Sequence, residues 1–316
     1  SMWISNTATA AMMLPLALGI LRHLDLQAER RTVVFLLLGI AYSASIGGLG
    51  SLIGSPPNAI AARALGIDFQ GWLAIGLPLM AILLPLMVAA LWLVFRPALN
   101  RRVQVPQEPI PWTPPRLLAM AVFALTALAW IFGAPLGAAL GVTSPDSVVA
   151  LAAAVAVVVL GLARWGEVAR HTDWGVLLLF GGGLTLSAVL RSSGASAVLG
   201  DQVAAALAQA HPFLVIAGVA AFIVILTEFT SNTASAALLV PVFAVIGERM
   251  GLPPTVLVLM IGLGASCAFM LPVATPPNAI VFGTGFVRQR DMIRAGAVLN
   301  AVCIVVLTLW GWFVLR

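Results

Sequence analysis

Two copies of the tripeptide Ser-Asn-Thr stand out, because each places two hydroxyls and one amide between apolar stretches. Their residues are Ser5, Asn6 and Thr7 in the first copy and Ser231, Asn232 and Thr233 in the second. Hard cations prefer oxygen ligands, and we extend this preference from divalent ions to a small monovalent ion such as sodium. The helix start after each tripeptide also offers free N–H groups and a positive dipole end to an anion. The tripeptides are therefore candidate sites for a cation and an anion together.

A second pair of motifs follows the tripeptides in the same order. Gly-Ser-Pro-Pro-Asn-Ala-Ile begins at Gly54, and Ala-Thr-Pro-Pro-Asn-Ala-Ile begins at Ala274. The tripeptides are 226 residues apart (231 − 5) and the second motifs 220 apart (275 − 55), which is an ordered internal repeat. Glycines and adjacent prolines cannot continue an ordinary helix, and in lipid the freed backbone groups must bond to protein, water or ions. Broken helices at matching places in two halves indicate a transport site.

These motifs predict two symmetric cation sites, each combining a tripeptide with carbonyls of a facing loop. The candidate ligands are Ser5 and Asn6 with residues 47–51 in the first site, and Thr227, Ser231 and Asn232 with residues 267–275 in the second. For a single Ser-Asn-Thr the competing interpretation is a helix N-cap, whose hydroxyl closes the next helix. Two copies, each followed by a Pro-Pro-Asn break, favour a site. We expect Asn58 and Asn278 to hold the loops in shape rather than to contact substrate.

Glu228 is the one carboxylate within the apolar stretches around the second tripeptide. Ionisable residues at membrane depth are functional candidates by default. Two interpretations remain open at this point. Glu228 either forms structural hydrogen bonds beside the tripeptide or tunes the affinity for a cation.

The apolar stretches that must position these residues include several that are too short to cross a membrane. The stretches are residues 7–21, 32–46, 57–65, 72–95, 116–132, 147–163, 174–190, 213–228, 232–246, 254–264, 276–285 and 292–315. A spanning helix needs about 20 residues, whereas residues 213–228 and 232–246 have 16 and 15, so we interpret them as a re-entrant helical hairpin. Residues 32–65 and 254–285 each resemble one crossing interrupted by a loop. The sequence therefore predicts an all-α polytopic membrane protein with inverted repeats, re-entrant hairpins and broken helices.

Composition supports a membrane protein and excludes other classes. Apolar residues make up 61% of the chain, charged residues 9%, and the mean hydropathy is +1.09, values typical of polytopic membrane proteins. The net charge of +5 comes from arginine alone and lies mostly in short loops, which indicates membrane topology and no nucleic-acid partner. If the hairpins return to the side they enter, 12 arginines lie on one side and 4 on the other. This split places the first side in the cytoplasm of a multi-pass protein of the cytoplasmic (inner) membrane.

The repeat also divides the chain into three regions. Residues 1–95 form the C-terminal part of the first repeat, residues 96–115 a proline-rich cytoplasmic linker, and residues 116–316 the second repeat. The offset of 226 places position 1 opposite Thr227, so the stretch from about residue 112 to 226 has no counterpart in the first half. We expect the chain to lack an N-terminal part.

The paired Ser-Asn-Thr tips and Pro-Pro-Asn breaks resemble those of the divalent anion/sodium symporter family. Residues 265–281, ASCAFMLPVATPPNAIV, are also similar to that family's C-terminal signature, and the likeness covers essentially the whole chain. The resemblance implies an elevator-type transporter, usually a homodimer, in which a transport domain with both hairpins moves against a scaffold. It further implies a small divalent anion as substrate, a dicarboxylate such as succinate, malate or fumarate, or else citrate or sulfate, carried with several sodium ions.

The resemblance also implies roles for individual residues. The substrate contacts would be Ser5, Asn6, Thr7, Ser231, Asn232 and Thr233, with Thr275 nearby. The sodium ligands would be Ser5, Asn6 and Gly47 in the first half, and Thr227, Asn232 and Ala274 in the second. The first half departs from the pattern at Ser51, where many members have threonine. The residues around Ser5 and Ser55 are similar to the dicarboxylate branch of the family.

Three functional hypotheses remain beside one exclusion. A sodium-coupled dicarboxylate symporter, a dicarboxylate or other divalent-anion exchanger of the same fold, and an inactive fragment of such a transporter are each compatible with the sequence. A membrane-embedded enzyme is not, because the apolar segments contain no histidine and only Glu228 as an acid.

Overall fold

The computed structural model describes residues 1–21, 29–98, 111–133, 135, 137, 141–142, 144–172, 174–207 and 209–315, and within them the regular structure is helical. The first half contains α1 (Asn6–Leu21), α2 (Arg30–Gly47), the short 3₁₀ helix η1 (Gly48–Gly50), α3 (Pro56–Leu65) and α4 (Phe69–Phe95). The second half contains α5 (Pro114–Ile131), α7 (Pro145–Val159), α8 (Trp165–His171), α9 (Trp174–Ser192), α10 (Ala195–Ala206), α11 (Pro212–Leu226), α12 (Asn232–Arg249), α13 (Pro254–Gly264), α14 (Pro276–Phe282) and α15 (Gln289–Phe313).

Proline marks the start of many of these helices, because its fixed φ suits the first helical turn and its missing N–H is not needed there. This includes α3 and α14, which begin at the Pro-Pro pairs of the repeated motif. It also includes α5, so Pro114 and Pro115 form its first turn and are not part of the expected linker. The middle of that linker, residues 99–110, lies outside the described residues. The sequence did not predict α8 and α10.

Both predicted helix interruptions are present. The chain leaves α2 through η1 and a bend before it enters α3, and it leaves α13 through a longer non-helical segment, residues 265–275, before it enters α14. We call residues 48–55 the first loop and residues 265–275 the second loop. The two breaks leave backbone groups at the centre of the protein that no helix can satisfy.

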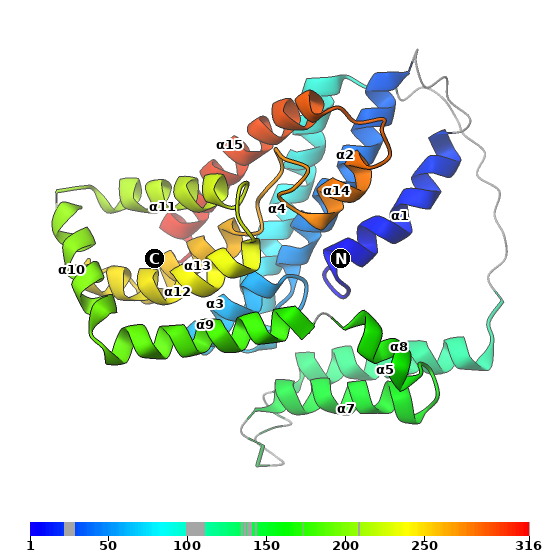
Figure 1. Cartoon of the computed structure of the whole chain (residues 1–316), viewed down its shortest axis with the longest axis horizontal. Coiled ribbons are helices and arrows are strands. Elements are labelled where there is room, and N and C mark those ends of the chain that lie inside the picture. The colour runs from blue at the N-terminus through cyan, green and yellow to red at the C-terminus, as the bar shows by residue number, and fades with distance from the viewer. Residues whose placement is uncertain are drawn as a thin grey trace.

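The predicted hairpin is formed by α11 and α12, which run in opposite directions and meet at a turn toward the middle of the molecule (Figure 1). Both helices pack against α13. Because α11 ends at Leu226, Thr227 and Glu228 belong to the turn, and Glu228 does not continue the helical arm as the apolar stretch suggested. Neither helix is among those long and apolar enough to cross a membrane.

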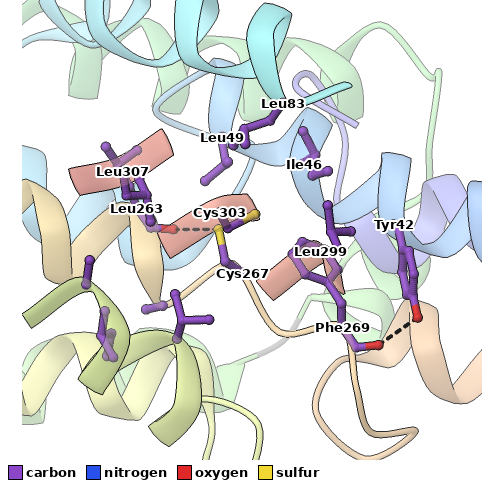
Figure 2. Packing of buried hydrophobic residues seen from close by; sticks show 14 of the residues in the cluster. Tyr42, Ile46, Leu49, Leu83, Leu263, Cys267, Phe269, Leu299, Cys303 and Leu307 are labelled. Atoms are coloured by element: carbon purple, nitrogen blue, oxygen red, sulfur yellow. Dashed lines mark hydrogen bonds between the residues drawn. The ribbon is translucent and has the colours of Figure 1, made fainter. Parts of the chain in front are cut away.

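The hydrophobic core joins the two halves of the repeat. Figure 2 shows Tyr42, Ile46 and Leu49 from the first half beside Phe269 and Leu299 from the second. The helices also exchange partners across the repeat, since α1 packs on α14 and α12 packs on α3. The two halves therefore form one core that holds both loops.

Four helices are long and apolar enough to span a membrane: Arg30–Gly50, which joins α2 and η1, Phe69–Phe95, Pro114–Ile131 and Gln289–Phe313. Neither α5 nor α7 has a fully buried residue, and both expose leucines such as Leu125 and Leu151. A helix that is apolar all round fits a lipid environment. The pair contacts the rest of the chain where Trp130 stacks on Phe69, and the Asp146 carboxylate accepts a hydrogen bond of 2.9 Å from the Phe69 N–H.

Candidate functional site

Both tripeptide serines cap the helix that follows them. The Ala8 N–H donates to Ser5 Oγ at 3.2 Å, and the Ala234 N–H donates to Ser231 Oγ at 3.4 Å. The N-cap interpretation therefore holds at both tips. A hydroxyl that accepts one hydrogen bond keeps its own proton and a second lone pair, and both serines are exposed. Capping and ligand binding can coexist at these positions.

The second tip brings together the predicted ligands Thr227 and Asn232. Thr227 is fully buried, and its Oγ1 lies within hydrogen-bond distance of both Asn232 Oδ1 and the Ala265 carbonyl oxygen, the latter at 2.8 Å. Because a hydroxyl donates one proton, one of these two oxygens stays available to a cation. Ala274 and Thr275 lie buried at the end of the second loop, where Thr275 Oγ1 caps α14 by accepting from the Asn278 N–H at 3.3 Å.

The first tip has an unpaired ligand atom. Asn6 Oδ1 is buried and has no hydrogen-bond partner. It lies against Gly48, where an added Cβ would be only 2.5 Å from it and 2.9 Å from the Gly54 carbonyl oxygen. Gly47, the expected ligand, lies instead beside the Ser1 side chain. Gly48 and Gly54 were missed as site residues, although Gly54 stands 220 residues before Ala274 and the repeat could have identified it.

Asn58 and Asn278 hold the two loops in the same way. Asn58 Nδ2 donates to the carbonyls of Gly48 and Ser51, both at 2.8 Å, and Asn278 Nδ2 donates to those of Ala268 and Leu271 at 3.2 and 3.0 Å. Each of the three positions in one half is 220 residues from its counterpart. The prediction that these asparagines shape the loops is confirmed. Their Oδ1 atoms are buried, and neither has a hydrogen-bond partner in the structure.

A pair of glycines, Gly76 and Gly296, extends the same offset. A Cβ at Gly76 would lie 2.3 Å from the Leu49 carbonyl oxygen, and one at Gly296 would lie 2.4 Å from that of Phe269. Only glycine lets α4 and α15 approach the loop backbone this closely. Sequence reasoning missed both residues, although their separation of 220 was a usable signal.

The same two carbonyls each accept a hydrogen bond from a buried aromatic side chain. Trp72 Nε1 donates to Leu49 O at 3.1 Å, and Tyr42 OH donates to Phe269 O at 2.7 Å, as Figure 2 shows. The two loops also meet directly, because the hydroxyls of Ser55 and Ser266 are 2.9 Å apart. Both loops are therefore fixed from several sides.

Glu228 binds the backbone of the second loop. Its Oε1 accepts from Phe269 N at 2.7 Å and Met270 N at 2.9 Å, and its Oε2 accepts from Met270 N and Leu271 N, both at 3.1 Å. Asn300 Nδ2 on α15 donates to Oε1 at 2.8 Å. The structural role that the sequence left open is therefore present.

The chemistry of these groups suits a small hard cation. The candidate ligands are neutral hydroxyl, amide and carbonyl oxygens, which hard cations prefer. Within the described part of the chain, no cluster of histidine, cysteine, aspartate and glutamate could hold a transition metal. The buried and unpaired Asn6 Oδ1 is an atom that a sodium ion would satisfy.

A multi-pass helical protein with a duplicated site of neutral oxygens belongs to the membrane transporters rather than the enzymes. Residues 1–316 match the model of the sodium:sulfate symporter transmembrane region, and the chain belongs to this divalent anion/sodium symporter family. Sodium is then a co-transported ion and not a resident cofactor.

Three relatives illustrate the range of the match. An uncharacterized transporter of Haemophilus influenzae is 55% identical over 99% of this chain and 69% of its own length. An uncharacterized transporter of Methanocaldococcus jannaschii is 37% identical over 98% of this chain and 70% of its own length. The sodium-dependent dicarboxylate transporter SdcS of Staphylococcus saprophyticus is 33% identical over 99% of this chain and 66% of its own length.

Proposed function

We propose that this protein carries dicarboxylates of the succinate, malate and fumarate class across the cytoplasmic membrane together with sodium ions. The observation that carries the proposal is the duplicated tip and loop, with Asn6 Oδ1 buried and unpaired in one half and Thr227 held against Asn232 in the other. The similarity to a sodium-dependent dicarboxylate transporter supports the choice of substrate.

The proposed sodium ligands lie where each tip meets its loop. They are Ser5, Asn6 and Gly47, to which the geometry adds Gly54, in the first half, and Thr227, Asn232 and Ala274 in the second. The proposed substrate contacts are the exposed and half-exposed polar groups of the tips, Ser5, Asn6, Thr7, Ser231, Asn232 and Thr233, with Thr275 nearby. Two tips offering separate helix N-termini suit a substrate with two separated carboxylates.

The proposed mechanism is an elevator movement in a homodimer, with the two halves related as inverted repeats. The domain that moves contains both tips and both loops, which share one core. The helices α5 and α7 belong to the scaffold, and their contact with the start of α4 is small. A small contact between two units is compatible with sliding between them.

Uptake of radiolabelled succinate into proteoliposomes tests this function. With an inward sodium gradient, the intact transporter should accumulate succinate, and Asn6→Ala or Asn232→Ala should abolish accumulation. Thr126→Ala is the matched control, because the Thr126 hydroxyl bonds only to Val122 O one turn earlier on α5. Normal uptake in both asparagine variants would refute the proposed site. Accumulation that needs preloaded dicarboxylate instead of sodium would replace symport with exchange.

A further inference from the structure

Glu228 and Asn300 break the symmetry of the repeat. The tip offset places Met2 opposite Glu228 (228 − 226), and the loop offset places Met80 opposite Asn300 (300 − 220). The loop residue between them, Met270, corresponds to Gly50 (270 − 220). A carboxylate and an amide in the second half thus correspond to two thioethers in the first.

The structure confirms that these positions are equivalent in space. A Cβ at Gly50 would lie 2.7 Å from Met80 Sδ and 3.6 Å from Met2 Cβ, so both methionines flank this loop position. Glu228 and Asn300 flank Met270 in the second half, where the carboxylate accepts from the Met270 N–H and from Asn300 Nδ2. The first loop is therefore bounded by neutral, apolar side chains at the place where the second loop contacts a carboxylate.

The Glu228 side chain has the surroundings of an ionised group. It is only 2% exposed, and its contacts are with the N–H groups of Phe269, Met270 and Leu271 and with the Asn300 amide. All of these groups are donors, which is the environment a carboxylate requires. None of the ion pairs found among the described residues involves Glu228. A buried charge that is hydrogen-bonded but not neutralised attracts a cation to its vicinity.

That vicinity contains the second cation site. Glu228 directly follows Thr227 in the tip, and the loop that it binds leads to Ala274 within a few residues. We propose that Glu228 is a fixed counter-charge that gives the second site a higher sodium affinity than the first, with Asn300 as a positioning residue for the carboxylate. This inference rests on the proposed sodium coupling. The sequence left cation tuning by Glu228 open, and the unequal halves give it a physical basis.

The sodium dependence of succinate uptake tests the counter-charge. Glu228→Gln keeps the size of the side chain and removes its charge, so we expect the half-saturating sodium concentration to rise about tenfold, equivalent to roughly 1.4 kcal/mol. The KM for succinate at saturating sodium should stay within about twofold, since the direct substrate contacts remain. Glu167→Gln is the matched control, because Glu167 is an exposed carboxylate that accepts a backbone N–H at 3.3 Å.

A second variant separates the charge from the hydrogen bonds. Asn300→Leu removes one donor but leaves the charge and the three backbone contacts, so its half-saturating sodium concentration should stay near that of the wild type. Equal shifts in Glu228→Gln and Asn300→Leu would show a structural role only and overturn the proposal. An unchanged sodium dependence in Glu228→Gln would also overturn it. Wild-type uptake that ignores sodium would instead refute the proposed function itself.

A reverse experiment keeps the proposal testable if Glu228→Gln fails to fold. The double variant Met2→Glu/Met80→Asn recreates the carboxylate and amide beside Gly50. We expect its half-saturating sodium concentration to fall below that of the wild type, because the first site then gains a counter-charge. No change in a folded double variant would overturn the proposal.

Discussion

The contact of α15 with the second loop gives the sharpest prediction, made with Gly296→Ala. A Cβ at this position would lie 2.4 Å from Phe269 O, 2.5 Å from Phe269 C and 2.6 Å from Met270 Cα. All three are backbone atoms, so no side chain can rotate to make room. Helix and loop must separate by about 1 Å to restore ordinary van der Waals contact.

The cost of this separation can be estimated from general values. Inserting a methyl group into a packed core costs about 1–3 kcal/mol, and alanine regains up to about 1 kcal/mol of helix propensity relative to glycine. The movement also stretches the hydrogen bonds from Tyr42 and to Glu228, which contribute about 1 kcal/mol each. We therefore expect Gly296→Ala to lower the free energy of unfolding by about 1–3 kcal/mol.

Thermal unfolding in detergent, with and without sodium, measures the effect. Gly218→Ala is the matched control, because Gly218 lies within α11 and an added Cβ there meets no atom within 4 Å. Gly296→Ala should unfold at a lower temperature than both the wild type and Gly218→Ala, and sodium should protect it less. If the two glycine variants were equally stable, the proposed packing of α15 against the second loop would be incorrect.

Three further changes test other parts of the structure. Gly48→Ala would place a Cβ 2.5 Å from Asn6 Oδ1, so we expect at least tenfold less sodium-driven uptake at normal expression; wild-type uptake would argue against the first cation site. Asn278→Leu leaves two buried loop carbonyls without their donor, which should cost about 2–6 kcal/mol in thermal unfolding; a change below about 1 kcal/mol would contradict this. Asp146, in the first turn of α7 outside the four long apolar helices, has a pKa that burial raises, against the lowering by the Phe69 N–H. The free energy of unfolding should therefore fall as the pH rises from the usual aspartate pKa, about 3.9, through the native one, and an Asp146→Asn variant that kept this pH dependence would refute the assignment.

Much of the helical organisation could be predicted from the sequence. The apolar stretches located α1, α4 and α15 to within a few residues at most boundaries, because the lipid environment and the helix period constrain long apolar runs strongly. The breaks were also predictable, since glycine and Pro-Pro sequences act locally. The ends of α11 and the start of α5 were less accurate, because caps and turns there are decided by contacts with the rest of the fold.

The candidate site divides in the same way. The repeated motifs alone identified Asn6, Asn232 and the loop asparagines, since two copies at nearly constant spacing are a property of the sequence itself. The pairing of Glu228 with Phe269 and Asn300 required the tertiary structure, because the partners are 41 and 72 residues away.

The repeat also provided the numbers that relate Glu228 to Met2, but these numbers do not show what either side chain contacts. Only the folded chain brings α15, the tip and the loop together. Which donors surround the buried carboxylate depends on this packing, and local sequence does not determine it.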